Sequence, residues 1–256
     1  MNAGRTARDR ARAELTQEIK DTARRQLATD GAERLSLRAV SRELGMVSSA
    51  LYRYFPSRDD LLTALIIDAY DALGAAVEKA AAGVLGAAKE EPAAGPLDSA
   101  KEQSAAAPRE AWLAACRAVR AWARKHPHEY ALIYGSPVPG YSAPQSTVQP
   151  ASRVAVCLLG VLQRAAEAGV LAVPEDAAEP SETLVGQLQP LEEIAPGVPR
   201  AVLLRTGMIW AQLFGLVSFE LFGQFVGTFD PADELFEAAI ASHADFLGLG
   251  ERVGQR

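Results

Sequence analysis

Apolar residues recur along most of the chain at every third or fourth position, the spacing of a helix that buries one face. In the first such run, Leu15, Ile19, Ala23 and Leu27 follow one another at every fourth position, and Gly31 ends the run. Alternating apolar and polar residues, the pattern of a half-buried strand, never extend beyond a few positions. The pattern therefore predicts an all-α protein.

Two short helices come next, with Gly45 at the turn between them. Ser36 is a suitable N-cap for the first, whose apolar stripe lies within residues 37–44, and Gly45 suits a left-handed stop. The second helix is expected over about residues 48–55. Two short helices joined by a turn of about four residues predict a helix-turn-helix.

A longer helix follows Pro56, with Ser57 as its N-cap, and is expected over about residues 57–85. Beyond it, the Ala-, Pro- and Gly-rich residues 86–108 favour a connection without a core of its own. The rest of the chain predicts helices at about 109–125, after Pro127, at 150–168, at 200–225 and at 232–248, with loops at 136–149 and 169–198.

Charge divides the chain after the first three helices. Residues 1–58 hold twelve Lys and Arg against seven Asp and Glu, a net charge of +5, whereas the remainder holds fourteen against twenty-five, a net charge of −11. A basic segment on an acidic body is typical of a polyanion-binding module joined to another domain. Arg5, Arg8, Arg10 and Arg12 could equally form a solvated tail, and charge alone leaves both interpretations open.

Uncharged apolar segments in this chain are short. The longest, residues 206–219, lies between Arg205 and Glu220 and is shorter than the roughly 20 residues that span a bilayer. The N-terminus is charged and lacks the apolar stretch of a secretory signal, and Cys116 and Cys157 do not make a disulfide framework. We therefore expect a soluble, cytoplasmic protein with no membrane partner.

The second short helix has the composition of a helix that lies in the major groove of DNA. Leu51 and Phe55 can anchor it from behind, while small and hydroxyl side chains at its start allow close approach to base edges. Neighbouring Tyr and Arg side chains suit phosphates, which fix register rather than sequence. The residues expected to contact DNA are Ser36, Arg38, Ser48, Ser49, Ala50, Tyr52, Arg53, Tyr54 and Arg58. An ordinary helical hairpin with half-buried tyrosines accounts for the periodicity equally well.

Residues 36–66, SLRAVSRELGMVSSALYRYFPSRDDLLTALI, resemble the DNA-binding segment of the TetR family of bacterial transcriptional regulators. The matching features are the Ser-Leu-Arg opening, the Leu-Gly pair at 44–45, the Leu-Tyr and Tyr-Phe pairs within 51–55, and Ser-Arg at 57–58 before an acidic, leucine-rich helix. Val47 departs from the family, which often has a serine cap there. The first turn of the recognition helix, and the serine that meets a base, therefore stay open.

The resemblance implies a DNA-binding head of three helices, residues 1–58, and a helical effector-binding and dimerisation domain, residues 59–256, connected by the helix at 57–85. It further implies a homodimer on a palindromic operator of double-stranded DNA, usually a repressor that a small-molecule effector releases. In such a dimer the two recognition helices lie about one turn of DNA apart, roughly 34–36 Å. We expect no cofactor.

The second half resembles, through less specific motifs, the C-terminal domain of a TetR subgroup of Trp/His/Gly type. The similar stretches are WARKHPHEYALIYGSPVPGY (122–141) and WAQLFGLVSFELFGQF (210–225). Their aromatic side chains can line one apolar interior with a few polar groups, as in a ligand pocket, and Gln212 and Phe219 are expected to face it. The residues expected to bind a small apolar or aromatic ligand are Trp112, Trp122, His126, Tyr130, Tyr134, Trp210 and Phe214. For each of them, simple packing in a solid core is the alternative.

The helices at about 200–225 and 232–248 are the expected homodimer interface. Small residues recur every three or four positions from Gly207 to Ser218, which lets another helix approach closely, and two helices from each subunit would form a four-helix bundle. Glu220 is either paired in that interface or solvent-facing. The alternative is that both helices pack only within their own subunit.

Two other functions stay open: an enzyme-like binding protein that uses the aromatic interior, and a small-molecule sensor that does not bind DNA. Catalysis needs a nucleophile with its base or paired carboxylates, and the sequence offers neither, so we expect no enzyme. His126 and His128 flank Pro127 and, even with Cys116, fall short of the four converging ligands of a closed zinc site. We expect no metal.

Overall fold

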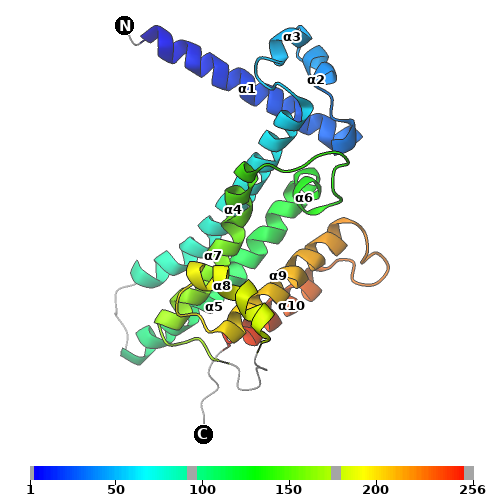
Figure 1. Ribbon diagram of the computed structural model, residues 1–256. Helices are drawn as coiled ribbons and strands as arrows, with labels where there is room; N and C mark the ends of the chain where they lie inside the picture. The colour runs from blue at the N-terminus through cyan, green and yellow to red at the C-terminus, as the bar shows by residue number, and fades with distance from the viewer. Residues whose placement is uncertain (1–2, 91–96, 174–179, 251–256) are drawn as a thin grey trace. The chain divides into compact units, whose positions relative to one another are not determined.

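The computed structural model describes residues 3–90, 97–173 and 180–250, and every regular element in these ranges is helical (Figure 1). The all-α prediction is confirmed. In chain order the elements are α1 (Ala3–Asp30), the 3-10 turn η1 (Ala32–Arg34), α2 (Leu37–Glu43), α3 (Ser48–Leu51), α4 (Arg58–Glu90), α5 (Leu97–Lys125), α6 (Pro127–Tyr134), the 3-10 turn η2 (Gln145–Thr147), α7 (Val148–Glu167), α8 (Glu182–Ile194), α9 (Arg200–Leu221) and α10 (Asp233–Phe246).

The chain forms two compact units. The first, which we call the head unit, comprises residues 1–72 and 126–151, and the second, the body unit, comprises residues 73–125 and 152–256. α4 passes from one to the other, while α6 belongs with the head unit although it directly follows α5. A functional boundary at residue 58 stays a prediction, because compactness of the fold does not test it.

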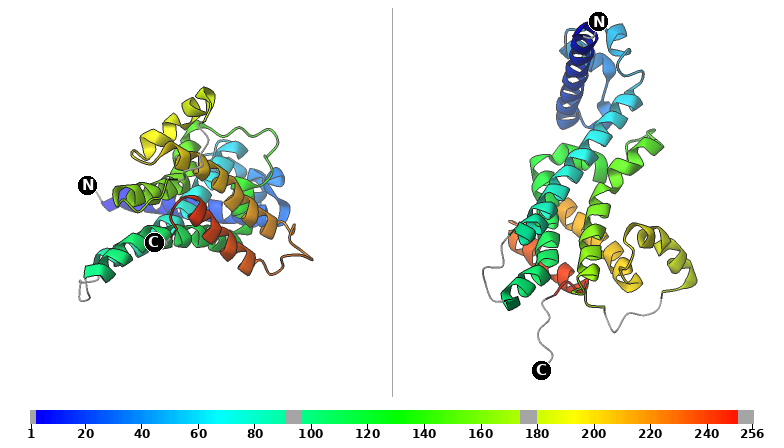
Figure 2. Two further views of the ribbon diagram at one scale, coloured as in Figure 1. Left: turned by 90° about the horizontal axis from the view of Figure 1, so that it is seen from below. Right: turned by 90° about the vertical axis from the view of Figure 1, so that its left-hand side faces the viewer.

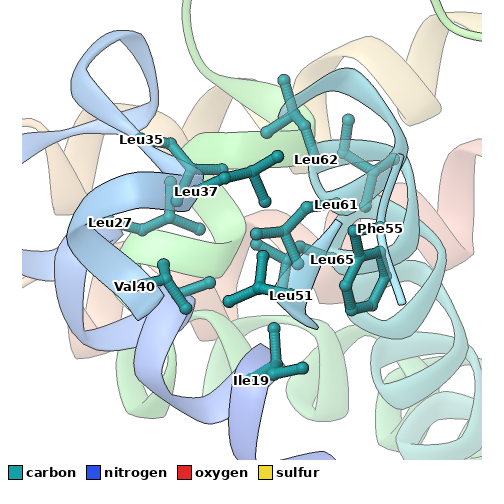
Figure 3. Packing of buried hydrophobic residues seen from close by; sticks show 12 residues of the cluster. Ile19, Leu27, Leu35, Leu37, Val40, Leu51, Phe55, Leu61, Leu62 and Leu65 are labelled. Atoms are coloured by element: carbon teal, nitrogen blue, oxygen red, sulfur yellow. The ribbon is translucent and has the colours of Figure 1, made fainter. Parts of the chain in front are cut away.

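An apolar core holds the first four helices of the head unit together (Figure 3). Ile19 of α1, Val40 of α2, Leu51 of α3 and Leu61 of α4 are completely buried in it. Each such side chain contributes about 1.5–3 kcal/mol by leaving water. The spacing that predicted one buried face on α1 is thereby confirmed.

Polar contacts attach α6 and the loop after it to this core. Asp68 of α4 accepts hydrogen bonds from Lys20 Nζ at 2.8 Å and from Arg24 Nη2 at 2.6 Å, and Arg24 lies 3.3 Å from Glu129 of α6. The Thr63 hydroxyl lies 2.8 Å from that of Tyr141. α1, α4 and α6 therefore share one partly buried ion network.

The body unit packs α9 against α5, α8 and α10 (Figure 2). Trp112 of α5, Leu162 of α7, Leu213 of α9 and Ile240 of α10 are completely buried. Arg153 of α7 forms a two-point ion pair with the Glu78 carboxylate of α4, at 2.8 and 2.6 Å, and thereby lowers the pKa of that carboxyl.

Two segments predicted as connections are helical. α5 begins at Leu97 and so includes much of the predicted connection 86–108, of which residues 91–96 lie outside the described ranges. Ala, Lys, Glu and Gln are strong helix formers, and their propensity outweighs the scarcity of large apolar residues. α8 lies within the predicted loop 169–198, where the Ser181 hydroxyl caps it by accepting from Leu184 N.

Helix ends differ from the sequence-based boundaries in smaller ways. α1 begins at Ala3, well before its apolar face starts. α9 ends at Leu221 rather than near residue 225, and Gly223 just beyond it has a left-handed φ of 78°. At 22 residues α9 is also the one helix in the described ranges that is long and apolar enough to cross a membrane, and one side of it packs against α5, α8 and α10.

Candidate nucleic-acid interface

Helix caps and a glycine turn determine where α2 begins and ends and where α4 begins. Ser36 caps α2 by accepting from Ala39 N, and Gly45 adopts a left-handed φ of 64° in the turn between the two helices. At the start of α4, the Ser57 hydroxyl accepts from Asp60 N at 3.1 Å and donates to the Asp60 carboxylate at 2.7 Å. Both predicted caps and the predicted glycine stop are confirmed.

α3 and the turn after it have a buried side and an exposed side. Leu51 and Phe55 are buried in the core of the head unit. Ser49 and Arg53 are exposed, and Tyr52 exposes 42% of its surface. Contact with the major groove requires this arrangement, in which a short helix and the turn after it are anchored by buried side chains and present an exposed hydroxyl and an exposed guanidinium.

Ser48 faces α2. Its hydroxyl lies 3.0 Å from that of Ser41, which is buried and donates its own proton to Arg38 O at 2.9 Å. Because Ser41 has only one hydroxyl proton, Ser48 donates in this pair. Of the two α3 serines expected to contact DNA, Ser49 is therefore the one whose hydroxyl lies open.

The remaining predicted DNA contacts differ in how much of each side chain is available. Arg38 is exposed, Ala50 is half-buried, and Ser36 is engaged as the cap of α2. Tyr54 is half-buried, and the guanidinium of Arg12 lies over its ring, 5.3 Å from the centroid.

Arg58 lies at the start of α4 and ties it to the turn before α2. Its guanidinium donates to Ala32 O at 2.8 Å, Leu35 O at 3.2 Å and Glu33 O at 3.3 Å. Three carbonyl acceptors give it a structural role in the head unit, and contact of Arg58 with DNA stays a prediction.

Sequence reasoning did not select Val47 as a contact. It is the N-cap residue of α3, makes no side-chain cap bond, and exposes 70% of its surface. An apolar side chain so exposed at the start of α3 is available to a thymine methyl group. The departure from the usual serine was visible in the sequence, but its exposure depends on the turn geometry.

The seven residues expected to bind a ligand fall into two groups. Trp112, Trp122, Trp210 and Phe214 belong to the body unit, where the rings of Trp210 and Phe214 lie 4.5 Å apart. The other three belong to the head unit; they are His126, Tyr130 and Tyr134.

The head-unit group consists of two tyrosines with neighbouring, tilted rings and a paired histidine. The rings of Tyr130 and Tyr134 lie 5.2 Å apart, and burial raises the pKa of Tyr134 above its ordinary value of 10. His126 Nδ1 lies 2.8 Å from the Glu129 carboxylate. Gln212 and Phe219, expected to face an interior, are instead exposed on α9. That expectation is wrong because α9 buries only one side, which Leu213 and Val217 occupy.

Glu220 is paired within its own subunit, and its side chain is only 17% exposed. Its two carboxylate oxygens accept from Arg120 of α5 at 2.7 and 2.8 Å, within the same subunit. Arg120 also donates to Asp233 at 3.0 Å, and this bond lowers the pKa of the Asp233 carboxyl. The small residues Gly207 and Ala211, by contrast, are exposed.

Comparison with known proteins agrees with this geometry. Residues 19–65 match the family described as bacterial regulatory proteins, tetR family, and residues 112–243 match the tetracyclin repressor-like C-terminal domain. The chain is 36% identical over 248 residues to the HTH-type transcriptional regulators Rv1816 of Mycobacterium tuberculosis and Mb1846 of Mycobacterium bovis, covering 91% of this chain and 95% of each relative.

Solved structures show the same fold. The crystal structure of the regulatory protein SCO4313 is similar at 33% identity with a TM-score of 0.67, over 93% of this chain and 98% of that one. The TetR family regulator PfmR of Thermus thermophilus, at 19% identity and a TM-score of 0.51 over 91% of this chain and 98% of that one, agrees in fold alone.

The helix-turn-helix and the helical body define a DNA-binding transcriptional regulator. Both parts of the chain match the corresponding parts of one family. The protein belongs to the TetR family of bacterial transcriptional regulators, which is a non-enzymatic DNA-binding family.

Proposed function

We propose that this protein is a ligand-responsive repressor that binds a palindromic operator as a homodimer, and that a small apolar or aromatic inducer releases it. It acts in the cytoplasm. The observation that carries the proposal is the outward side of α3 and the turn after it, where Ser49 and Arg53 are exposed while Leu51 behind them is buried.

Each exposed side chain has a distinct role in this proposal. Ser49 bonds to a base edge and Val47 contacts a thymine methyl group, so these two residues discriminate sequence. Arg53, Tyr52 and Arg38 contact phosphates and fix the register of the helix. Ser48 contributes by holding α3 against α2 through Ser41.

Fluorescence anisotropy with DNA from upstream of the protein's own gene tests the DNA contacts. Arg53→Gln removes one phosphate contact, so the slope of log affinity against log salt should fall by about 0.9, with a roughly fivefold loss of affinity at 0.15 M salt. Lys79→Gln is the matched control, because Lys79 is an exposed cation of the body unit. A wild-type protein without any salt-sensitive DNA binding would instead be a sensor that does not bind DNA.

The exposed side of α9 supports the homodimer. Met208, Phe219 and Phe222 are exposed, and no fully exposed residue from 207 to 229 carries a charge. Soluble monomers rarely expose a contiguous apolar surface of this kind. A second copy of the chain presents the same surface, and a two-fold axis would bring the two together with α10 beside them.

Sedimentation velocity tests this interface. Met208→Glu places a charge on the exposed side of α9 and should convert the dimer to monomers at micromolar concentration. Val156→Glu is the control, because Val156 is an exposed apolar residue of α7 in the same unit but outside the proposed interface. Dimerisation unaffected by Met208→Glu would place the interface elsewhere.

An unsatisfied donor supports a ligand in the body unit. The indole N–H of Trp112 is buried and has no acceptor among the described residues. Buried donors are normally paired, so an aromatic ligand with a carbonyl oxygen suits this position. The inducer can release DNA only by binding the released conformation more tightly than the DNA-bound one.

Thermal unfolding with aromatic ketones and the corresponding hydrocarbons tests this assignment. The ketones should raise Tm more than the hydrocarbons do for the wild-type protein, and Trp112→Phe should abolish the difference because it keeps a ring but removes the N–H group. A preference for ketones that survives in Trp112→Phe would exclude Trp112 as the donor.

A further inference from the structure

The N-terminal part of α1 extends beyond the core of the head unit (Figure 1). The first completely buried residue of the helix is Ile19, and Leu15 is half-buried. Every residue from 6 to 14 is exposed. Residues 6–14 of α1 therefore contribute nothing to the apolar core, so stabilisation of the core does not explain this part of the helix.

Two arginines of this extension share the face of α1 that is buried further along. At about 100° per residue, Arg8 and Arg12 each lie within roughly 20° of Ile19 around the helix axis, whereas Arg10 lies roughly 180° away. Arg8 is one turn beyond Arg12, about 6 Å farther along the axis. Both arginines thus point to the side on which the helix-turn-helix packs against α1.

The contact of Arg12 with Tyr54 independently supports this orientation. The Arg12 guanidinium lies 5.3 Å from the centre of the Tyr54 ring, directly after α3. Arg8 and Arg12 are both exposed, and within the described ranges neither is ion-paired with a carboxylate. Two cations that no carboxylate neutralises therefore lie on the side of the helix that also carries the contact to the recognition segment.

We propose that Arg8 and Arg12 bind DNA phosphates beside the groove that α3 occupies and so extend the footprint beyond the helix-turn-helix. This inference rests on the proposed DNA binding. Guanidinium groups suit phosphate oxygens, and phosphate contacts add affinity without reading sequence. Both residues lie outside the part of the chain that matches the family, which begins at residue 19.

The location of the two arginines favours DNA over a merely solvated tail. A solvated tail would have no preferred face, so Arg8, Arg10 and Arg12 would be equivalent. A DNA contact requires the face shared with the recognition segment, which Arg8 and Arg12 occupy and Arg10 does not. Arg10 therefore provides a control with the same charge, the same helix and the same exposure.

Anisotropy titrations of the full-length protein over a range of salt concentrations test the proposal, with upstream DNA and an unrelated duplex of equal length as probes. The variants are R8Q, R12Q and the control R10Q, each of which removes one positive charge and keeps a good helix former. For R8Q and R12Q the salt slope should fall by about 0.9, with a roughly fivefold loss of affinity at 0.15 M salt on both duplexes. R10Q should behave like the wild type.

Each outcome decides one part of the account. Equal losses in all three variants would overturn the inference, because they would reflect net charge alone, and three unchanged variants would overturn it as well. With either result, DNA binding by the wild-type protein would still support the proposed function. A wild-type protein that binds neither duplex would overturn both, and circular dichroism of each variant confirms that α1 stays helical.

Discussion

Removing Arg120 should strongly destabilise the body unit. Its side chain is only 9% exposed, makes a two-point bond to the Glu220 carboxylate, and lies over the Phe236 ring at 4.9 Å. Arg120→Met keeps most of the apolar volume but leaves Glu220, itself only 17% exposed, with the more distant Arg124 at 3.7 Å. A largely buried carboxylate then lacks its close partner.

The expected cost follows from burial. Breaking a buried ion pair by removing one partner costs about 3–5 kcal/mol, and the lower end applies here because Glu220 keeps some access to water. Asp233 adds little, since it is 55% exposed. For a chain of this size, about 3 kcal/mol corresponds to a fall in Tm of roughly 6–12 °C.

Urea unfolding followed by circular dichroism at fixed protein concentration measures this cost, and the concentration is fixed because dimerisation adds to apparent stability. Arg117→Met is the matched control. Arg117 lies on the same helix as Arg120 and forms a similar bond to Glu237 of α10, but these two side chains are 48% and 46% exposed. The control should lose less than about 1 kcal/mol. Equal losses for Arg117→Met and Arg120→Met would refute the reasoning from burial.

Three further predictions follow from the described residues. Gly45→Ala should cost about 1–2 kcal/mol in urea unfolding, because its φ of 64° is left-handed although the site has room for a Cβ. Arg58→Gln should lower the unfolding free energy of the head unit by about 1.5–3 kcal/mol, since it loses bonds to three carbonyls. His243 is buried, and burial lowers its pKa below the ordinary value of 6.5, so folding stability should fall as pH decreases below about 6.5. This fall in the free energy of unfolding with decreasing pH should be absent in His243→Leu. An unchanged fall in the variant would assign the pH dependence to other groups.

Much of the helix-turn-helix could be predicted from sequence because its signals are local. Ser36 and Ser57 cap helices through bonds to residues three positions away, and Gly45 is needed at a left-handed turn. The buried positions Leu51 and Phe55 follow from helical periodicity. Such features depend on a few neighbouring residues and not on the rest of the fold.

The features that the sequence did not reveal depend on distant contacts. Glu220 pairs with a residue 100 positions earlier, so its partner could not be chosen from periodicity. Ser48 faces inward because Ser41 accepts its proton, and Arg58 is occupied by carbonyls about 25 positions earlier. The helical N-terminal half of α5 was missed for another reason, since its helix-forming residues lack an apolar face.

Hydroxyl-radical footprinting of the wild-type protein on the DNA upstream of its gene tests the central claim most directly. If α3 lies in the major groove in each half of a symmetric dimer, two equivalent protected patches should appear, with their centres about one turn of DNA, roughly 34–36 Å, apart. A single asymmetric patch, or no protection at low salt where phosphate contacts are strongest, would contradict the account.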